Sequence, residues 1–446
     1  MSGVRIPSCP IFFIKIINKL QVRKKVMQPL RGTRDVLPDE IFFWQYIQAR
    51  ASNILALANY HEIRTPMIES TSLFKRSIGN GTDIVNKEMY NFIDQGAREI
   101  TLKPEGTASI ARAFISNKLY QENTIKRLWY LSPMFRYERP QNGRQRQFHQ
   151  LGIECIGSSN PMADVEVIRL AKSILDALEC SNYRLEINSI GNLEERNKYK
   201  QSLINYLQRY TNDLDNDSQK KLYTNPLKIL DSKNIKTQEI LYNGPSLYNY
   251  LTASSKKHFE TVCEYLSYLK INYTTNYNLV RGLDYYNYTA FEIKTNNTNN
   301  QNTICGGGRY DSLIKQLGGP DTPSVGWAIG VERLLLIIQE KLKLQKLTPI
   351  VYIATEDNFI RKEILEIIQL LEKRNISYEL DFHNHSLQKQ LKKADKMGVK
   401  ACIILRSYEI MNKCITLKKL ENSEQEQFSM SNINQLIQQL ESIQKN

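Results

Sequence analysis

The segment that most restricts how this chain can fold is residues 128–156, in which two stretches of strand-forming residues flank a basic loop. Residues 140–143 are typical of a turn, so the two stretches are predicted to pair as antiparallel strands. Successive side chains of a strand point to opposite faces, which separates the second stretch into two sets. The apolar set is Leu151, Ile153 and Cys155, and the polar set is Phe148, Gln150, Gly152 and Glu154. One face of this sheet is therefore predicted to pack on a core, while the other meets a ligand or, as the simpler alternative, solvent.

The loop and the end of the first strand are rich in arginine. Arg136 and Glu138 share one face of the strand, and the loop adds Arg139, Arg144 and Arg146. Guanidinium groups stay charged and donate in a planar fork that suits phosphate oxygens. These residues favour a polyanionic partner. The whole chain has a net charge of +14, which a solvated basic surface would also explain.

Length and composition limit the class of protein. The 446 residues suffice for about two to four domains. With 41% hydrophobic and 24% charged residues, the chain is not mostly disordered. It contains no run of about 18 apolar residues, so no membrane-spanning helix is predicted. Its seven cysteines are scattered without a Cys-x-x-Cys spacing, and no metal-ligating or Ser-His-Asp cluster is apparent, so no metal site is predicted.

Residues 1–26 form a basic leader that is set apart from fold prediction. Residues 1–34 contain eight Lys or Arg and no acidic residue. This composition is typical of an organelle-targeting extension, although serine is sparse. The alternative, equally open, is that translation begins at Met27.

Beyond the leader the sequence predicts two domains. Residues 27–340 form the first, interrupted at about residues 195–270 by a helical insertion. Residues 341–348 have the polar, basic composition of a linker. Residues 349–446 then alternate between strand and helix patterns, which predicts a separate α/β domain with a mostly parallel sheet.

The string Phe-Arg-Tyr-Glu at 135–138, with a loop ending at Phe148, resembles motif 2 of class II aminoacyl-tRNA synthetases. With Arg-Pro-Gln at 139–141 and Gln-Phe-His-Gln at 147–150, it resembles the histidine-specific family, the histidyl-tRNA synthetases. In that family the motif's Arg binds the α-phosphate of ATP, the acidic residue contacts the nucleotide and the Phe stacks on adenine. The resemblance assigns these roles to Arg136, Glu138 and Phe148.

Three further strings resemble the same family, although each alone would more often be an ordinary turn or strand end. The string 101–108 resembles the amino-acid-binding strand and turn, with Lys103 where the family usually has Arg. The string 279–286 resembles a histidine-specific signature, and 326–335 resembles motif 3. The resemblance implies roles for several of their residues. Glu105, Thr107 and Gln150 hold the α-ammonium group of histidine, Glu154 and Tyr286 contact its imidazole, and Tyr285 is a further histidine-binding residue. Arg281 meets the α-phosphate opposite Arg136, and Arg333 meets the γ-phosphate.

Two sets of residues are predicted to contact tRNA. In the motif 2 loop, Gln141, Arg144 and Arg146 are assigned to the acceptor end. In the second domain, Lys392, Lys393 and Lys396 lie in a segment of excess positive charge and are assigned to the anticodon region. A solvated helix face is the alternative for these lysines.

The resemblance implies an α+β protein: a class II antiparallel-sheet catalytic domain of six strands and a C-terminal α/β anticodon-binding domain. It implies a homodimer through motif 1, which appears weakly at residues 64–69. The implied reaction activates L-histidine with ATP, which brings Mg²⁺ as a substrate complex, and transfers histidine to tRNA-His without a tightly bound cofactor. The alternative is a non-catalytic paralogue, the regulatory subunit of ATP phosphoribosyltransferase. Usage rich in Asn, Lys, Ile and Tyr favours the plastid stroma, with a bacterial cytoplasm as the alternative.

Overall fold

The computed structural model describes residues 27–79, 82–141, 143–295, 303–342, 348–356, 362–383 and 385–445. The chain divides into two compact units, residues 1–343 and 344–446. The basic leader and most of the predicted linker lie outside the described residues. Among the helices of the described ranges, none is long and apolar enough to cross a membrane.

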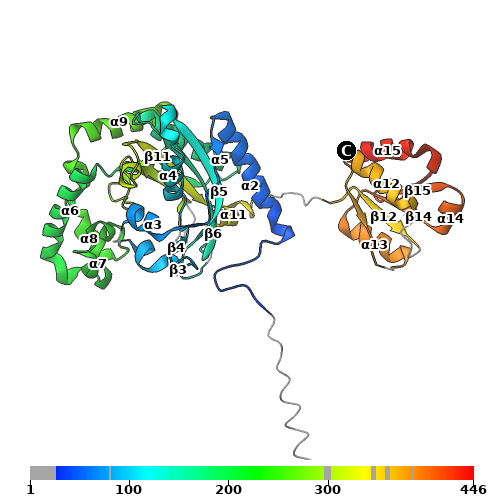
Figure 1. Cartoon of the computed structure of the whole chain (residues 1–446), viewed down its shortest axis with the longest axis horizontal. Coiled ribbons are helices and arrows are strands. Elements are labelled where there is room, and N and C mark those ends of the chain that lie inside the picture. The colour runs from blue at the N-terminus through cyan, green and yellow to red at the C-terminus, as the bar shows by residue number, and fades with distance from the viewer. Residues whose placement is uncertain are drawn as a thin grey trace, which may run out of the picture. The chain divides into compact units, whose positions relative to one another are not determined.

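The first unit is built on an eight-stranded sheet (Figure 1). Six central strands are antiparallel to their neighbours, and a two-residue strand adds in parallel at each edge. From edge to edge the strands are β1 (His61–Glu62), β5 (Lys126–Phe135), β6 (Gln147–Ile156), β11 (Ser324–Gly330), β10 (Thr303–Arg309), β9 (Asn287–Thr295), β7 (Tyr183–Ser189) and β8 (Thr274–Thr275). The predicted six-stranded antiparallel sheet is confirmed as its centre, and a short parallel strand extends it at each edge.

The predicted antiparallel pair is β5 with β6. Its register runs without interruption from Lys126 opposite Ile156 to Phe135 opposite Gln147. The apolar set of β6 is buried, as the alternation required. Trp327 of β11 lies opposite Ile153, and its indole Nε1 donates to the Val167 carbonyl of α5 (Pro161–Ala177) at 2.7 Å. Helix α5 therefore covers the apolar face, and α2 (Pro38–Leu57) packs against α5.

The polar face of the same strands meets the start of α4 (Thr107–Ser116), because the Thr107 hydroxyl donates to Glu154 of β6 at 2.7 Å. A small sheet precedes this helix, with strand order β2 (Ile68–Ser70), β4 (Glu99–Leu102) and β3 (Tyr90–Ile93). Helix α3 (Thr71–Ile78) packs its apolar residues against Ala108 of α4. Strand β11 passes at Gly330 directly into α11 (Val331–Ile338).

A helical segment lies between β7 and β8. Its α-helices are α6 (Leu193–Leu207), α7 (Asn216–Lys221), α8 (Ile235–Tyr242) and α9 (Ala253–Tyr268). Helix α6 begins with a capping box between Asn192 and Glu195, which satisfies backbone N–H groups that a helix start leaves free. Arg196, in the first turn of α6, donates to the carbonyls of Asp284 and Tyr286. The helical segment is thereby fastened to the string 279–286.

The second unit has a five-stranded sheet. Its strand order is β13 (Tyr378–Leu380), β12 (Val351–Thr355), β14 (Ala401–Leu405), β15 (Cys414–Lys419) and β16 (Gln425–Ser429). The first three strands are parallel, as expected for β/α alternation, but β15 and β16 are antiparallel. The prediction of a mostly parallel sheet was wrong here. Only the five-residue helix α14 (Ser407–Met411) separates β14 from β15, too little chain for a parallel crossover.

Helices cover both faces of this second sheet. Residues of α12 (Lys362–Lys373) and α15 (Ile433–Lys445) share one core with Val351 and Ile353. Ala394 of α13 (Leu387–Met397) shares the other core with Tyr352 and Ala354. The strand alternation at 351–354 therefore sets which helix packs on which side.

Candidate active site

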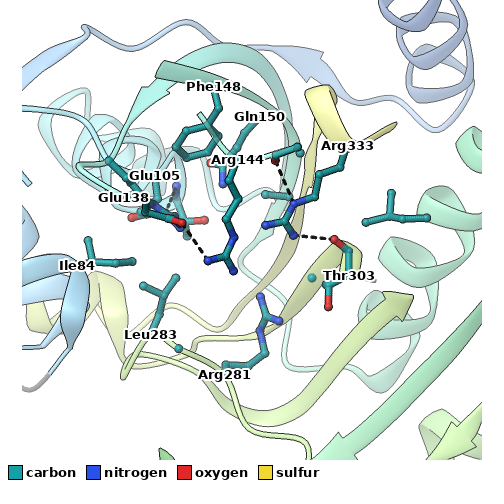
Figure 2. A pocket seen from close by; sticks show the side chains of 18 of the residues that line it. Ile84, Glu105, Glu138, Arg144, Phe148, Gln150, Arg281, Leu283, Thr303 and Arg333 are labelled. Atoms are coloured by element: carbon teal, nitrogen blue, oxygen red, sulfur yellow. Dashed lines mark hydrogen bonds and ion pairs between the residues drawn. The ribbon is translucent and has the colours of Figure 1, made fainter. Parts of the chain in front are cut away.

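A pocket of about 240 Å³ opens on the polar face of the large sheet (Figure 2). Its walls come from the β5–β6 connection, β6, the string 279–286, β10 and the start of α11. Eleven of the residues assigned from sequence line it: Glu105, Thr107, Arg136, Glu138, Arg144, Phe148, Gln150, Arg281, Tyr285, Tyr286 and Arg333. Segments far apart in the sequence thus meet in one cavity.

Arginine side chains dominate this pocket. Arg144, Arg281 and Arg333 point into it from three different elements (Figure 2). Arg136 is fixed by its Nε, which donates to the Pro104 carbonyl at 2.9 Å, and its guanidinium lies 5.3 Å from the Phe148 ring centre. Glu138 is ion-paired with Arg144 at 3.1 Å. Four cations around one cavity favour a ligand with several negative charges.

Arg333 links motif 3 to the motif 2 loop. Its guanidinium donates to the carbonyl of Thr303 at 2.8 Å and to that of Gly143 at 3.4 Å. Gly143 has a φ of 71°, and a Cβ there would come within 3.0 Å of the Arg333 side chain. A glycine therefore suits both this turn and the close approach of the arginine. Burial, followed by the nearby Arg144, lowers the pKa of Arg333.

Arg281 is held by a carboxylate that the sequence analysis missed. Its guanidinium pairs with Glu292 of β9 at 2.5 Å and lies 5.3 Å from the Tyr286 ring centre. The Thr303 hydroxyl donates to the same carboxylate at 3.1 Å. Burial lowers the pKa of Arg281, but Tyr286 and Glu292 raise it more, so the net direction is upward. The one available signal was an acidic residue between the apolar Phe291 and Ile293.

Two polar residues at the pocket's inner wall differ in how they are satisfied. Glu105 is buried and accepts from the backbone N–H groups of Thr107 and Ala108 at 2.7 and 2.8 Å, at the start of α4. Its burial raises the pKa of the carboxyl group. Gln150 is different: its Oε1 is buried and has no hydrogen-bond partner among the described residues. Because Gln150 lines the pocket, this oxygen is available to a donor on a ligand.

Glu154 lies beneath the pocket and does not line it. The side chain is fully buried, and the hydroxyls of Thr107 and Tyr310 both donate to its carboxylate. Gly326 of β11 leaves the space it occupies, because a Cβ there would overlap the carboxylate. Tyr310 was missed in the sequence, although it follows directly after the Gly306–Gly308 run and Arg309. Thr107 therefore separates Glu154 from the cavity.

Glu154→Gln is expected to change how stability depends on pH. Burial raises the pKa of Glu154 from 4.5 to about 8, although Tyr310 and Thr107 lower it in part. Between these values the folded chain keeps a proton that the unfolded chain releases, so rising pH lowers the free energy of unfolding, by about 1.4 kcal/mol per pH unit at most. Between pH 6 and pH 8 the melting temperature of the variant should therefore rise relative to that of the wild type. Parallel pH profiles would mean that Glu154 is ionised in the folded protein.

The remaining assigned residues lie outside the pocket. In the motif 2 loop, Gln141 is exposed and pairs through its backbone with Arg144. Arg146 stacks on the Tyr137 ring at 3.7 Å, and its Nε donates to the Glu138 carbonyl at 3.3 Å. In the second unit Lys392 and Lys396 are exposed on α13, whereas the Lys393 ammonium lies 3.7 Å from Glu379.

The comparisons with known proteins agree among themselves. The sequence matches the family model for histidyl-tRNA synthetase over residues 32–334 and that for the anticodon binding domain over residues 349–440. A chloroplastic histidine–tRNA ligase of Gracilaria tenuistipitata var. liui is 65% identical, over 93% of this chain and 99% of the relative. A histidine–tRNA ligase of Cyanothece sp. is 49% identical, over 91% of this chain and 95% of the relative. The solved structure of apo S. aureus histidyl-tRNA synthetase is 34% identical, with a TM-score of 0.74 over 91% of this chain and 98% of its own.

Proposed function

The chain belongs to the histidyl-tRNA synthetase family and is a histidine–tRNA ligase, and we propose that the arginine-lined pocket is where it activates histidine. The observation that carries this assignment is the meeting of Arg136, Arg281 and Arg333 with the unpartnered Gln150 oxygen in one cavity. The cations suit a nucleoside triphosphate, and the amide oxygen suits an ammonium donor.

We assign the nucleotide to the side of the pocket formed by the motif 2 loop and α11. Phe148 stacks on adenine, and Glu138 contacts the nucleotide once Arg144 turns toward phosphate. Arg136 and Arg281 hold the α-phosphate and Arg333 the γ-phosphate. Class II synthetases use ATP with Mg²⁺, and we infer that the ion arrives with ATP and is held mainly by phosphate oxygens.

In the proposed first step, a carboxylate oxygen of histidine bonds to the α-phosphorus. The bond from this phosphorus to the β-phosphate bridge oxygen breaks, and pyrophosphate leaves with the electron pair. No general base is required, because the attacking group is already ionised. Catalysis comes from alignment and from fixed cations around the charge that builds on the α-phosphate.

The amino acid is assigned to the inner end of the pocket. Glu105, Thr107 and Gln150 receive the α-ammonium group, which donates three hydrogen bonds. Tyr285 and Tyr286 lie beside the imidazole. Glu154 reaches the imidazole when the Thr107 hydroxyl, which now bonds it, turns to the substrate. A ligand without ring N–H donors would leave these groups unpaired, which is how such a site rejects other amino acids.

Histidine-dependent ATP–pyrophosphate exchange tests this assignment directly. Exchange should require L-histidine and should not occur with other amino acids. The alternative function, a regulatory subunit that binds histidine without activating it, is not favoured, because ligase relatives match nearly the whole chain. Histidine binding without any exchange would refute the proposed site chemistry.

We propose that tRNA-His contacts both units, through Gln141, Arg144 and Arg146 at the acceptor end and through α13 at the anticodon. Replacing Lys392, Lys393 and Lys396 together with alanine should raise the KM for tRNA. With fewer phosphate contacts, tRNA binding releases fewer counterions. The slope of log KM against log salt should therefore fall by up to about 3. Histidine-dependent exchange, which needs no tRNA, should stay at the wild-type rate.

A charge-matched triple variant on another helix is the control for this experiment. Lys362, Lys373 and Arg374 lie on or next to α12 and are exposed. Their replacement with alanine removes the same charge and should leave the salt slope near the wild-type value. Equal effects from both triple variants would show that total charge, not the α13 surface, determines tRNA binding.

We also propose a homodimer in the plastid stroma. Ile68 of β2, within motif 1 at 64–69, and Phe92 of β3 are exposed apolar residues of one small sheet, separated by β4. Such a group suits contact with a second copy.

The relatives from Gracilaria and Cyanothece support either a plastid or a bacterial cytoplasm.

A further inference from the structure

The second unit contains a cluster of metal-ligating side chains that the proposed function does not use. Asp381, His383 and His385 follow β13 with a spacing of two residues, and one ligand atom of each lies within 4.8 Å of the others. His383 Nδ1 is 3.3 Å from Asp381 Oδ1, and His385 Nδ1 is 3.2 Å from Asp381 Oδ2. Both imidazoles thus turn the same nitrogen toward one carboxylate.

Both separations are longer than a usual charge-assisted hydrogen bond, and only the 3.2 Å contact of His385 qualifies as a hydrogen bond. A charge-assisted N–H···O bond is usually about 2.7–2.9 Å long. In a tetrahedral site with ligands about 2.0–2.1 Å from zinc, neighbouring ligand atoms are about 3.3–3.4 Å apart. The two measured separations lie close to that edge length but reach different oxygens of Asp381, so one side chain must rotate before both nitrogens and a single oxygen share an ion. The histidine rings are stacked at 5.2 Å, so the imidazoles need only side-chain rotation to converge.

The carboxylate is anchored as a metal ligand usually is. Its side chain is 1% exposed, and Oδ2 accepts from the Tyr352 hydroxyl at 2.9 Å. The backbone N–H of His383 donates to Oδ1 at 2.8 Å. Such supporting bonds fix a ligand's orientation and raise metal affinity. The histidines are 73% and 43% exposed, so an ion can enter from solvent.

One positive group lies near the cluster. The Lys393 ammonium is 3.9 Å from Asp381 Oδ2 and 3.7 Å from Glu379. An ion at Asp381 would repel this ammonium, but Glu379 offers it a partner on the neighbouring side. Lys393 therefore does not close the site.

We propose that Asp381, His383 and His385 form a surface site for a divalent transition-metal ion such as Zn²⁺, with the remaining coordination position open to solvent. Two imidazoles and a carboxylate suit zinc and cobalt, whereas Mg²⁺ and Ca²⁺ prefer oxygen ligands. The spacing Asp-x-His-x-His is visible in the sequence, where the search for metal sites found no cluster. The site lies in the second unit, which has its own core, whereas the arginine-lined pocket lies in the first.

The test uses the full chain without an oligohistidine tag, titrated with Co²⁺ and then displaced by Zn²⁺. Wild type should develop the visible absorption of tetrahedral Co²⁺, which Zn²⁺ abolishes at one equivalent. The variant His383→Ala/His385→Ala should lose this equivalent. Tyr352→Phe, which removes only the supporting hydroxyl, should weaken affinity about 10-fold or more.

His61→Ala is the matched control, because His61 is an exposed histidine of the first unit outside any such cluster. It should bind Co²⁺ as wild type does. Thiolate coordination by the cysteines is recognised by near-ultraviolet charge-transfer bands and would persist in the double-histidine variant. An unchanged visible signal and stoichiometry in that variant, or no tetrahedral signal in wild type, would overturn the proposal.

Discussion

Arg281→Ala is expected to slow histidine-dependent ATP–pyrophosphate exchange at least about 100-fold, with little change in the KM for histidine. Arg281 projects into the pocket across from Phe148 (Figure 2). Its guanidinium is already oriented by Glu292 at 2.5 Å, so under the proposed assignment it would stabilise charge on the α-phosphate without reorganising. Steady-state exchange at saturating ATP and histidine measures the loss.

Arg139→Ala is the control for this prediction. Arg139 belongs to the same basic loop as the pocket's Arg144, but it is exposed and does not line the cavity. Its removal costs the same charge and should leave exchange near the wild-type rate. If Arg281→Ala also exchanged normally, the assignment of Arg281 to the α-phosphate would be rejected.

Arg309→Leu is expected to destabilise the protein by about 3–5 kcal/mol, because it leaves a buried carboxylate without its main partner. Arg309 is 1% exposed and pairs with Asp164 of α5, which is fully buried. Its Nη1 also donates to the Ser158 carbonyl at 2.7 Å. Burial raises the pKa of Asp164, but Arg309 and His258 together lower it by more than burial raises it. The net direction is downward, and the carboxyl group is charged. Urea unfolding measures the change.

A double-mutant cycle separates the pair from general packing damage. Replacing Asp164 with leucine as well removes the stranded charge, so the double variant should be more stable than Arg309→Leu alone. The exposed pair Arg98–Asp94 is the surface control, and Arg98→Leu should hardly move the melting temperature. His258 Nε2 also lies 3.4 Å from Asp164 Oδ2. A double variant no more stable than the single one would refute this explanation.

Much of the site could be predicted because its signals are local. The β5–β6 pair follows from a turn between two alternating stretches, and the alternation correctly separated Leu151 and Ile153 from Gln150. Strands of the second unit were predicted in the same way. The direction of the last two strands, β15 and β16, was not predicted. The connection through α14 is too short for the parallel crossover that the preceding β/α alternation suggests.

The alternation of side chains along one strand shows which face each residue lies on, but not how deeply it is buried. Gln150 and Glu154 share a face of β6, yet one lines the pocket and the other lies beneath it. The difference arises from α4, which places Thr107 over Glu154, and from β11, which leaves room at Gly326. Arg146 shows the same limit, since its stacking on Tyr137 turns it away from the cavity that Arg144 enters.

Three close-packed glycines, Gly106 before α4, Gly152 of β6 and Gly326 of β11, limit which substitutions the chain accepts. A Cβ at Gly106 or Gly152 would overlap the buried Tyr130 ring, and one at Gly326 would overlap Glu154 and the Ile153 backbone. Each of these residues belongs to a different element, so no shift of one strand relieves all three. A single substitution at any of these positions therefore causes steric overlap with a neighbouring residue. A larger residue at any one of the three would need coordinated replacements in the residues that it meets.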